Sequence, residues 1–319
     1  MTDHEDGRSD GATPAPDPDL LPPPAVPVGR DSTAGVAVMA HLRRQTAVLL
    51  AARAGIANDA SDSVHASRVA ARRLRSGLRV YGDLLKGDVS ARLRPELAWY
   101  AGVLAPARDL EVFAAALSRD SDDAHGYGDA LLPWLHRRRR AAALDAAEQL
   151  SDARADVLLR ALVDISRAPA FTDVAARRAR KVLAPRVLHA DRRATHQIEG
   201  LRPSDDADSW HSARIAAKRA RYAAEVGAPA LGTACDALGQ LWASVTEPLG
   251  EAQDAVIQRT LVLDRVDDPT VPLSAGEAFV CGLYVASTHD REVEAHRRAR
   301  DVWRASREEH ARLRRAVQA

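Results

Sequence analysis

Two basic segments of the chain combine residue types and spacings that suit contact with phosphate groups. The first reads VHASRVAARRLRSGLRV from Val64 to Val80, and the second reads WHSARIAAKRARYAAEV from Trp210 to Val226. Each contains a histidine that is followed by arginine or lysine at steps of three and four residues. Guanidinium groups form paired hydrogen bonds to phosphate, so these segments are candidates for binding a polyanion.

A helix would bring these side chains together on one face. At about 100° per residue, the basic side chains of each segment fall in one stripe that runs for roughly four turns. The stripe of the first segment consists of His65, Arg68, Arg72, Arg75 and Arg79. The second stripe consists of His211, Arg214, Lys218 and Arg221, and Glu225 takes the place that corresponds to Arg79.

A single basic helix is usually a solvated surface, and like charges three or four residues apart destabilise it by roughly a few tenths of a kcal/mol per pair. Here one sign of charge persists through a whole stripe, and the pattern returns in the second half of the chain. The repetition favours a shared ligand over solvation. An extended polyanion would neutralise both stripes.

The composition predicts an all-α protein. Aromatic residues make up only 4% of the 319 residues, and apolar residues recur at three- and four-residue spacing from residue 35 onward. We expect helices at 35–55, 61–86, 90–104, 106–119, 127–150, 152–167, 171–184, 185–198, 205–227, 229–246, 248–265, 274–290 and 291–317, with breaks near Pro185, Pro229 and Pro248. Cys235 and Cys281 have no metal or redox spacing and are expected to be core thiols in a reducing compartment.

The repeat extends beyond the two basic segments. APARDLEVFAAAL at 105–117 parallels GEAQDAVIQRTLV at 250–262, and a similar number of residues separates His65 from Asp109 and His211 from Asp254. This predicts two similar helical bundles related by a pseudo-twofold axis, with halves at about 35–150 and 151–319. Asp109 and Asp254 are expected to pair with arginines of the basic helices and to fix their side chains.

The first 34 residues differ from the rest. They contain seven acidic residues against two arginines, which gives them a net charge of −5. Because the whole chain carries +1, the remaining residues carry +6. They are also rich in proline and lack hydrophobic periodicity. We therefore expect residues 1–34 to form a disordered acidic tail, and residues 35–319 to form the folded part.

These motifs together resemble the CHAD domain, a family named for conserved histidines in an α-helical domain. VHASRVAARRLRSGLRVY, ARDLEVF, WHSARIAAKRARYAAEV and LGEAQDAVI occur here in the family's order and spacing, and the resemblance covers residues 35–319. Many relatives carry an N-terminal triphosphate tunnel domain. We expect this chain to resemble the members that lack it, since 34 residues cannot hold a tunnel barrel.

The resemblance implies a basic central groove between two bundles that binds inorganic polyphosphate, with polyphosphate granules as a further partner and no cofactor. It carries the family's ligand-binding positions over to His65, Arg68, Arg72, Arg73, Arg75, His211, Arg214, Lys218, Arg219 and Arg221. We also predict that Arg79 contacts the ligand, because it lies on the first stripe.

The sequence favours binding without catalysis. It contains no glycine-rich phosphate loop, no GxSxG motif and no metal-ligand pattern. Glu292 and Glu294 imitate the carboxylate pair of tunnel phosphatases, but a helical setting would point them apart. We therefore predict neither a catalytic nor a metal site.

Nucleic acid is the alternative ligand, because arginine contacts to phosphate do not separate RNA from polyphosphate. Single-strand binders use aromatic platforms, however, and Tyr222 is the only ring near either stripe. The longest apolar run is too short to span a bilayer, so no membrane partner is expected and the predicted location is the cytoplasm.

The histidine at the start of each stripe is charged only when its ring is protonated, and this depends on the pH. If a polyanion draws a proton onto it, affinity rises as the pH falls from about 8 to 6. A neutral histidine that only donates a hydrogen bond would give little dependence on pH.

Overall fold

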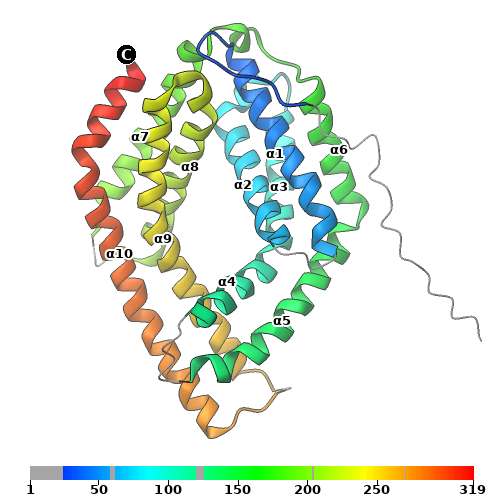
Figure 1. Ribbon diagram of the computed structural model, residues 1–319, viewed down its shortest axis with the longest axis vertical. Helices are drawn as coiled ribbons and strands as arrows, with labels where there is room; N and C mark the ends of the chain where they lie inside the picture. The colour runs from blue at the N-terminus through cyan, green and yellow to red at the C-terminus, as the bar shows by residue number, and fades with distance from the viewer. Residues whose placement is uncertain (1–23, 58–61, 120–125, 203–204, 270) are drawn as a thin grey trace, which may run out of the picture.

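A computed structural model describes residues 24–57, 62–119, 126–202, 205–269 and 271–319. Figure 1 shows the helices that these residues form. They are α1 (Ala34–Ala57), α2 (Ser63–Tyr81), α3 (Val89–Val103), α4 (Ala105–Arg119), α5 (Tyr127–Leu150), α6 (Ala153–Arg167), α7 (Ala179–Gly200), α8 (Ala207–Leu231), α9 (Thr233–Val266) and α10 (Ala275–Gln318). The all-α prediction is confirmed, with short 3₁₀ turns at 82–84 and 173–176 as the remaining helical elements of the described chain.

The expected helix breaks at proline are wrong. Pro185, Pro229 and Pro248 lie inside α7, α8 and α9. The predicted pair of helices over 274–317 is likewise one continuous helix, α10. A proline inside a helix loses one hydrogen bond and crowds the preceding turn. Tertiary packing overrides that cost here, since Val187, Ala230 and Leu249, which flank these prolines, are all core residues.

The first core lies among α1, α2, α3 and α6. Leu42, Leu74, Leu97 and Leu159 are fully buried in it, one from each helix. The predicted boundary between the halves at 150/151 is therefore wrong, because α6 packs with the first bundle. The start of α7 joins the same core through residues such as Leu183, so the chain passes to the second bundle within α7.

The second core lies among α7, α8, the first half of α9 and the last half of α10. Val187, Ala217, Trp242 and Trp303 represent the four helices. The rings of Trp242 and Trp303 stack with their centroids 5.1 Å apart. Cys235 is buried in this core as a free thiol, as predicted, and burial raises its pKa to about 12.

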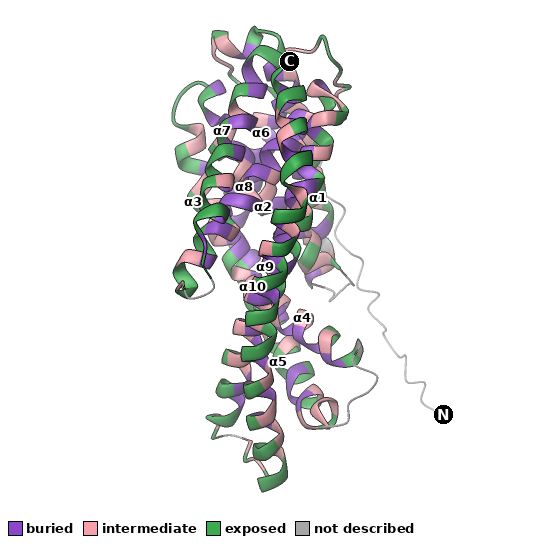
Figure 2. Cartoon of the chain, turned by 90° about the vertical axis from the view of Figure 1, so that its left-hand side faces the viewer, coloured by how far each residue is buried: buried purple, intermediate pink, exposed green. Residues whose placement is uncertain are grey.

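A third cluster joins the two bundles at one end of the molecule. Phe113 of α4, Leu131 of α5, Val262 of α9 and Tyr284 of α10 pack together there, with Cys281 as a second buried thiol. The 44 residues of α10 therefore serve two cores, and Figure 2 shows this helix running along much of the molecule. Among the helices described, none is long and apolar enough to cross a membrane.

The predicted disordered tail is shorter than residues 1–34. Residues 24–33 cross one end of α1, where Figure 1 shows them in dark blue. Val28 packs against the first core, and the Ala179 amide donates to the Ser32 carbonyl at 2.9 Å. These contacts order the segment, so the prediction is wrong for residues 24–33. Residues 1–23 lie outside the described part.

A buried carboxylate connects helices of the second bundle. Asp191 of α7 is fully buried, and its Oδ1 accepts hydrogen bonds at 2.8 Å from Trp242 Nε1 of α9 and from His310 Nε2 of α10. Its Oδ2 lies 3.0 Å from Arg314 Nε of α10. One aspartate thereby connects three helices at the centre of the bundle.

We expect Asp191→Ala to lower the free energy of unfolding by about 3–5 kcal/mol, because it leaves the Arg314 charge and two buried N–H groups without their acceptor. Urea denaturation followed by circular dichroism measures the change. The control Asp290→Ala, at an exposed position of α10, should remain within about 0.5 kcal/mol of the wild type. Equal stabilities of the two variants would show that the contacts of Asp191 do not stabilise the bundle.

Candidate functional site

The two basic helices of the repeat, α2 and α8, lie against each other. The Tyr81 hydroxyl of α2 donates a 2.8 Å hydrogen bond to the Ala223 carbonyl of α8, and both residues are buried. Gly77 permits close approach on the α1 side, since a Cβ at this position would lie 3.0 Å from Nε2 of His41. The stripes of the two segments therefore belong to one site.

Four cations meet between these helices. Arg68 and Arg72 of α2, with Arg214 and Lys218 of α8, form what we call the central cation cluster. Burial, and then the charge of Arg72, lower the pKa of Arg214. Burial also lowers the pKa of Lys218 to about 7, and the charges of Arg214 and Arg72 act in the same direction. The arginines remain charged at neutral pH, whereas the lowered pKa of Lys218 weakens the hold of its amine on the proton.

Two nitrogen atoms of this cluster are buried without a partner. Nε of Arg72 and Nε of Arg214 form no hydrogen bond with any described residue. A buried polar group is nearly always paired, and a charged group even more so, because burial removes its water. The cluster therefore has unused capacity to donate hydrogen bonds to an anion.

The two aspartates that correspond to each other in the repeat, Asp109 and Asp254, have different partners. Oδ1 of Asp109 accepts a hydrogen bond from Nη1 of Arg68 at 2.9 Å, which confirms the predicted pairing. Asp254 forms no ion pair with any described cation, so the expected pairing is wrong for this residue. Burial raises its pKa, although Arg214 and Lys218 are near enough to oppose the shift. Asp254 thus offsets the charge of the cluster only partly.

The two histidines also have different neighbours. Burial, followed by the charges of Arg108 and Arg72, lowers the pKa of His65, the direction that a proton-linked role requires. His211 instead forms a 3.1 Å hydrogen bond from Nδ1 to Oε1 of Gln253. Arg108 and Gln253 occupy corresponding positions of the repeat, so this difference follows from one substitution between the halves.

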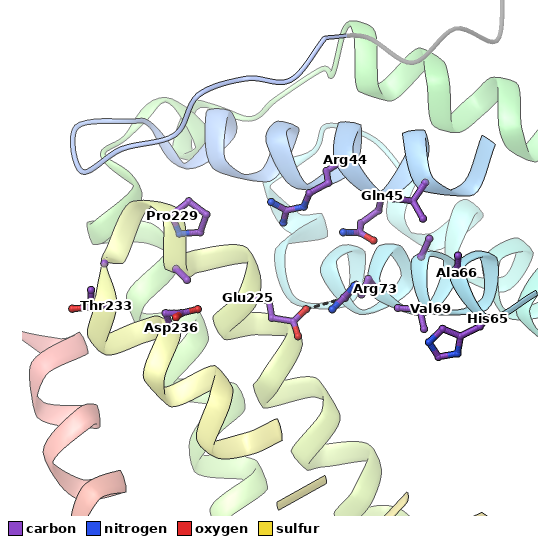
Figure 3. A pocket seen from close by; sticks show the side chains of 14 residues that line it. Arg44, Gln45, His65, Ala66, Val69, Arg73, Glu225, Pro229, Thr233 and Asp236 are labelled. Atoms are coloured by element: carbon purple, nitrogen blue, oxygen red, sulfur yellow. Dashed lines mark hydrogen bonds and ion pairs between the residues drawn. The ribbon is translucent and has the colours of Figure 1, made fainter. Parts of the chain in front are cut away.

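Two predicted ligand residues already have a carboxylate partner. Nε of Arg73 donates to Oε2 of Glu225 at 3.0 Å, and Nε of Arg221 donates to Oε1 of the same residue at 2.9 Å. Arg73 and Glu225 line a cavity of about 840 Å³ that Arg44 and Asp236 also border (Figure 3). The sequence places Glu225 at the position that corresponds to Arg79 but does not predict that it engages both arginines.

The remaining predicted arginines gather with two residues that the sequence reasoning missed. Partial burial, and then Arg79 and Arg94, lower the pKa of Arg75. Burial, and then Arg79, Arg193 and Arg94, lower that of Arg219. Arg94 of α3 and Arg193 of α7 lie outside the repeated motifs, so no sequence pattern distinguished them from other surface arginines.

A search of the described residues for three or more His, Cys, Asp or Glu side chains that could hold a metal ion finds no such group. The site is thus a set of cations, most of them on two adjacent helices, with three carboxylates beside them, Asp109, Asp254 and Glu225. Its chemical capacity is to bind negative charge.

Comparison with known proteins identifies the family. The family model of the CHAD domain matches residues 40–263, which include both basic helices. The chain belongs to the CHAD domain family. The resemblance seen in the sequence is thereby confirmed.

Two solved structures share this CHAD fold. The CHAD domain from the plant Ricinus communis superimposes with a TM-score of 0.70 at 21% identity, covering 88% of this chain and 96% of that one. PptA from Streptomyces chartreusis gives a TM-score of 0.68 at 23% identity, covering 86% of this chain and 100% of that one.

Two curated relatives come from Mycobacterium tuberculosis, strains CDC 1551 and H37Rv, and are described as uncharacterized proteins. Each is 28% identical over 309 residues, which cover 89% of this chain and 53% of the relative. The chain therefore spans about half the length of these relatives.

The low pKa of Lys218 predicts how anion binding depends on pH. A bound anion stabilises the charged amine and raises its pKa above the free value of about 7. Binding then takes up a proton, so affinity for tripolyphosphate, used as a probe, should fall as the pH rises above 7, by at most about tenfold per pH unit. Isothermal titration calorimetry at fixed ionic strength measures this slope.

Lys218→Arg should flatten the slope, because arginine keeps its charge throughout this range. The control Arg137→Lys introduces a lysine at an exposed position of α5, outside the site, and should leave the slope unchanged. A wild-type affinity that is constant between pH 7 and 9 would contradict the prediction.

Proposed function

We propose that this protein binds inorganic polyphosphate in the site between α2 and α8, and that it does so without turning the polymer over. The observation that carries this proposal is the pair of buried, unpartnered Nε atoms of Arg72 and Arg214, which lie beside Lys218. Buried cations that repel one another raise the electrostatic free energy of this site, and a bound anion lowers it.

The extent of the cationic surface supports a polymeric anion over a single phosphate. The stripe of α2 from His65 to Arg79 covers about 21 Å at 1.5 Å per residue. Two or three donors suffice for one phosphate group, whereas this stripe and its neighbours on α8 offer many more. A chain of linked phosphates would satisfy several of these cations at once.

RNA is the rival ligand, and the surroundings of Tyr222 make it the weaker candidate. Tyr222 is the ring that the sequence places nearest to the stripes, and it is only 7% exposed. A base stacks on an accessible aromatic face. Polyphosphate needs no such platform, so an arginine site with a buried ring suits it better.

The proposal of binding without turnover rests on the carboxylates that sequence reasoning considered for catalysis. Glu292 of α10 forms an ion pair with Arg259 of α9 at 2.9 Å, and Glu294 forms one with Arg297 of the same helix, α10, at 2.6 Å. Phosphoryl transfer usually needs carboxylates that hold metal ions near the phosphate. These two glutamates instead neutralise arginines.

The double variant Arg72→Gln/Arg214→Gln tests the site, because it should shift affinity and stability in opposite directions. Loss of two buried donors should weaken polyphosphate binding by at least about tenfold. Removal of two mutually repelling, unpaired charges should raise the free energy of unfolding without ligand by about 1 kcal/mol. Fluorescence anisotropy and urea denaturation measure the two effects.

The control Arg137→Gln/Arg138→Gln removes the same charge from an exposed part of α5 and should change both quantities little. Equal losses of affinity in the two double variants would show that binding depends on the total positive charge of the protein. That result would overturn the proposed site. Wild-type protein that binds no polyphosphate would overturn the function.

Competition and product release test the ligand and the absence of turnover. Excess single-stranded RNA should not displace labelled polyphosphate at physiological salt, and incubation with magnesium or manganese should release no orthophosphate. Displacement by equimolar RNA would favour the rival ligand. Orthophosphate release that Glu292→Gln abolishes would show that the protein is an enzyme.

A further inference from the structure

The internal repeat predicts that the two sides of the α2–α8 pair are equivalent. In the repeat, Arg73 corresponds to Arg219, Arg75 to Arg221, and Arg79 to Glu225. Helical rotation at about 100° per residue places Arg75 at one edge of its stripe and Arg73 beyond the other edge, and it places Arg221 and Arg219 in the same way. A pseudo-twofold axis then brings Arg75 and Arg79 to the side of Arg219, and Arg221 and Glu225 to the side of Arg73.

The first of these sides gathers arginines, with Tyr222 near Arg75. Arg75, Arg79 and Arg219 meet Arg94 of α3 and Arg193 of α7 there. None of these five arginines forms an ion pair or a side-chain hydrogen bond with another described residue. We call this group the arginine face.

The second side is largely neutralised. Glu225 holds Arg73 and Arg221, and Asp236 borders the same cavity, with Arg44 as a third arginine (Figure 3). Three arginines therefore face two carboxylates on this side, and His65 also borders the cavity. The arginine face instead has five cations and no carboxylate partner among the described residues. One substitution in the repeat, arginine to Glu225, accounts for much of the difference.

A polyanion distinguishes strongly between such sides. It gains by neutralising unpaired cations, and it is repelled by carboxylates that already serve as counterions. To reach Arg73 or Arg221 it would have to displace Glu225, which remains covalently in place at high effective concentration. The symmetric backbone thus offers an asymmetric ligand surface.

We propose that the polyanion is bound from one side only: it lies on the arginine face, reaches the central cation cluster from there, and is excluded from the opposite side by Glu225. This inference rests on the proposed function and adds to it the path of the polymer. It also assigns binding roles to Arg94 and Arg193, which lie outside the two histidine helices.

Two matched arginines test the asymmetry. Arg193 of α7 and Arg44 of α1 are both exposed, and each lies on the helix that precedes a histidine helix, so Arg193→Gln and Arg44→Gln remove equal charge at comparable places. Affinity for long-chain polyphosphate is measured by fluorescence anisotropy over a series of salt concentrations. Arg193→Gln should weaken binding several-fold and lower the slope of log K against log salt by about one, as for one lost phosphate contact on DNA.

Arg44→Gln should leave both the affinity and the slope within error of the wild type. Arg94→Gln should behave like Arg193→Gln, because both residues belong to the arginine face. Equal effects of Arg193→Gln and Arg44→Gln would overturn the asymmetry while leaving polyphosphate binding intact. Absence of wild-type binding would instead overturn the proposed function itself.

Glu225→Gln provides the converse test. It removes the charge that neutralises Arg73 and Arg221, so a second cationic side becomes available and affinity should increase several-fold. In that background, Arg44→Gln should weaken binding. A Glu225→Gln protein with native circular dichroism and unchanged affinity would overturn the role of Glu225 in exclusion.

Discussion

Arg72, Arg214 and Lys218 repel one another across the junction of α2 and α8, and the rest of the structure has to hold them there. Their burial depresses the pKa of each, and Asp254 compensates the charge only in part. An isolated pair of helices with this surface would separate, because unpaired buried charge is costly. The cations can remain together only because other contacts fix the two helices.

Those contacts are distributed over three hydrophobic clusters. The first and second cores anchor α2 and α8 on the sides away from the cations, and the third cluster links the far ends of the bundles. Tyr81 adds a direct hydrogen bond between the two helices. The long helices α9 and α10 each contribute to two clusters, which ties the second bundle to the end where α4 and α5 pack. The packing of the hydrophobic clusters thus offsets the repulsion between the buried cations of the site.

The carboxylates determine which cations stay free. Asp109 and Glu225 engage Arg68, Arg73 and Arg221, whereas Arg72, Arg214 and the arginine face have no such partner among the described residues. The positions of a few acids therefore shape the proposed binding surface as much as the positions of the many arginines. The pseudo-twofold repeat is broken at these places, at Glu225 and at the pair Arg108 and Gln253.

The sequence by itself determined the helical class, the internal repeat and the family, because hydrophobic periodicity and the histidine motifs are local patterns. It also placed Arg72, Arg214 and Lys218 on the correct stripes, since rotation along a helix follows from residue spacing alone. Only the tertiary structure decided that α6 belongs to the first bundle, that Asp254 is unpaired and that Arg94 and Arg193 join the site. These features depend on which helices pack together, and that depends on the fit of whole surfaces rather than on any local spacing.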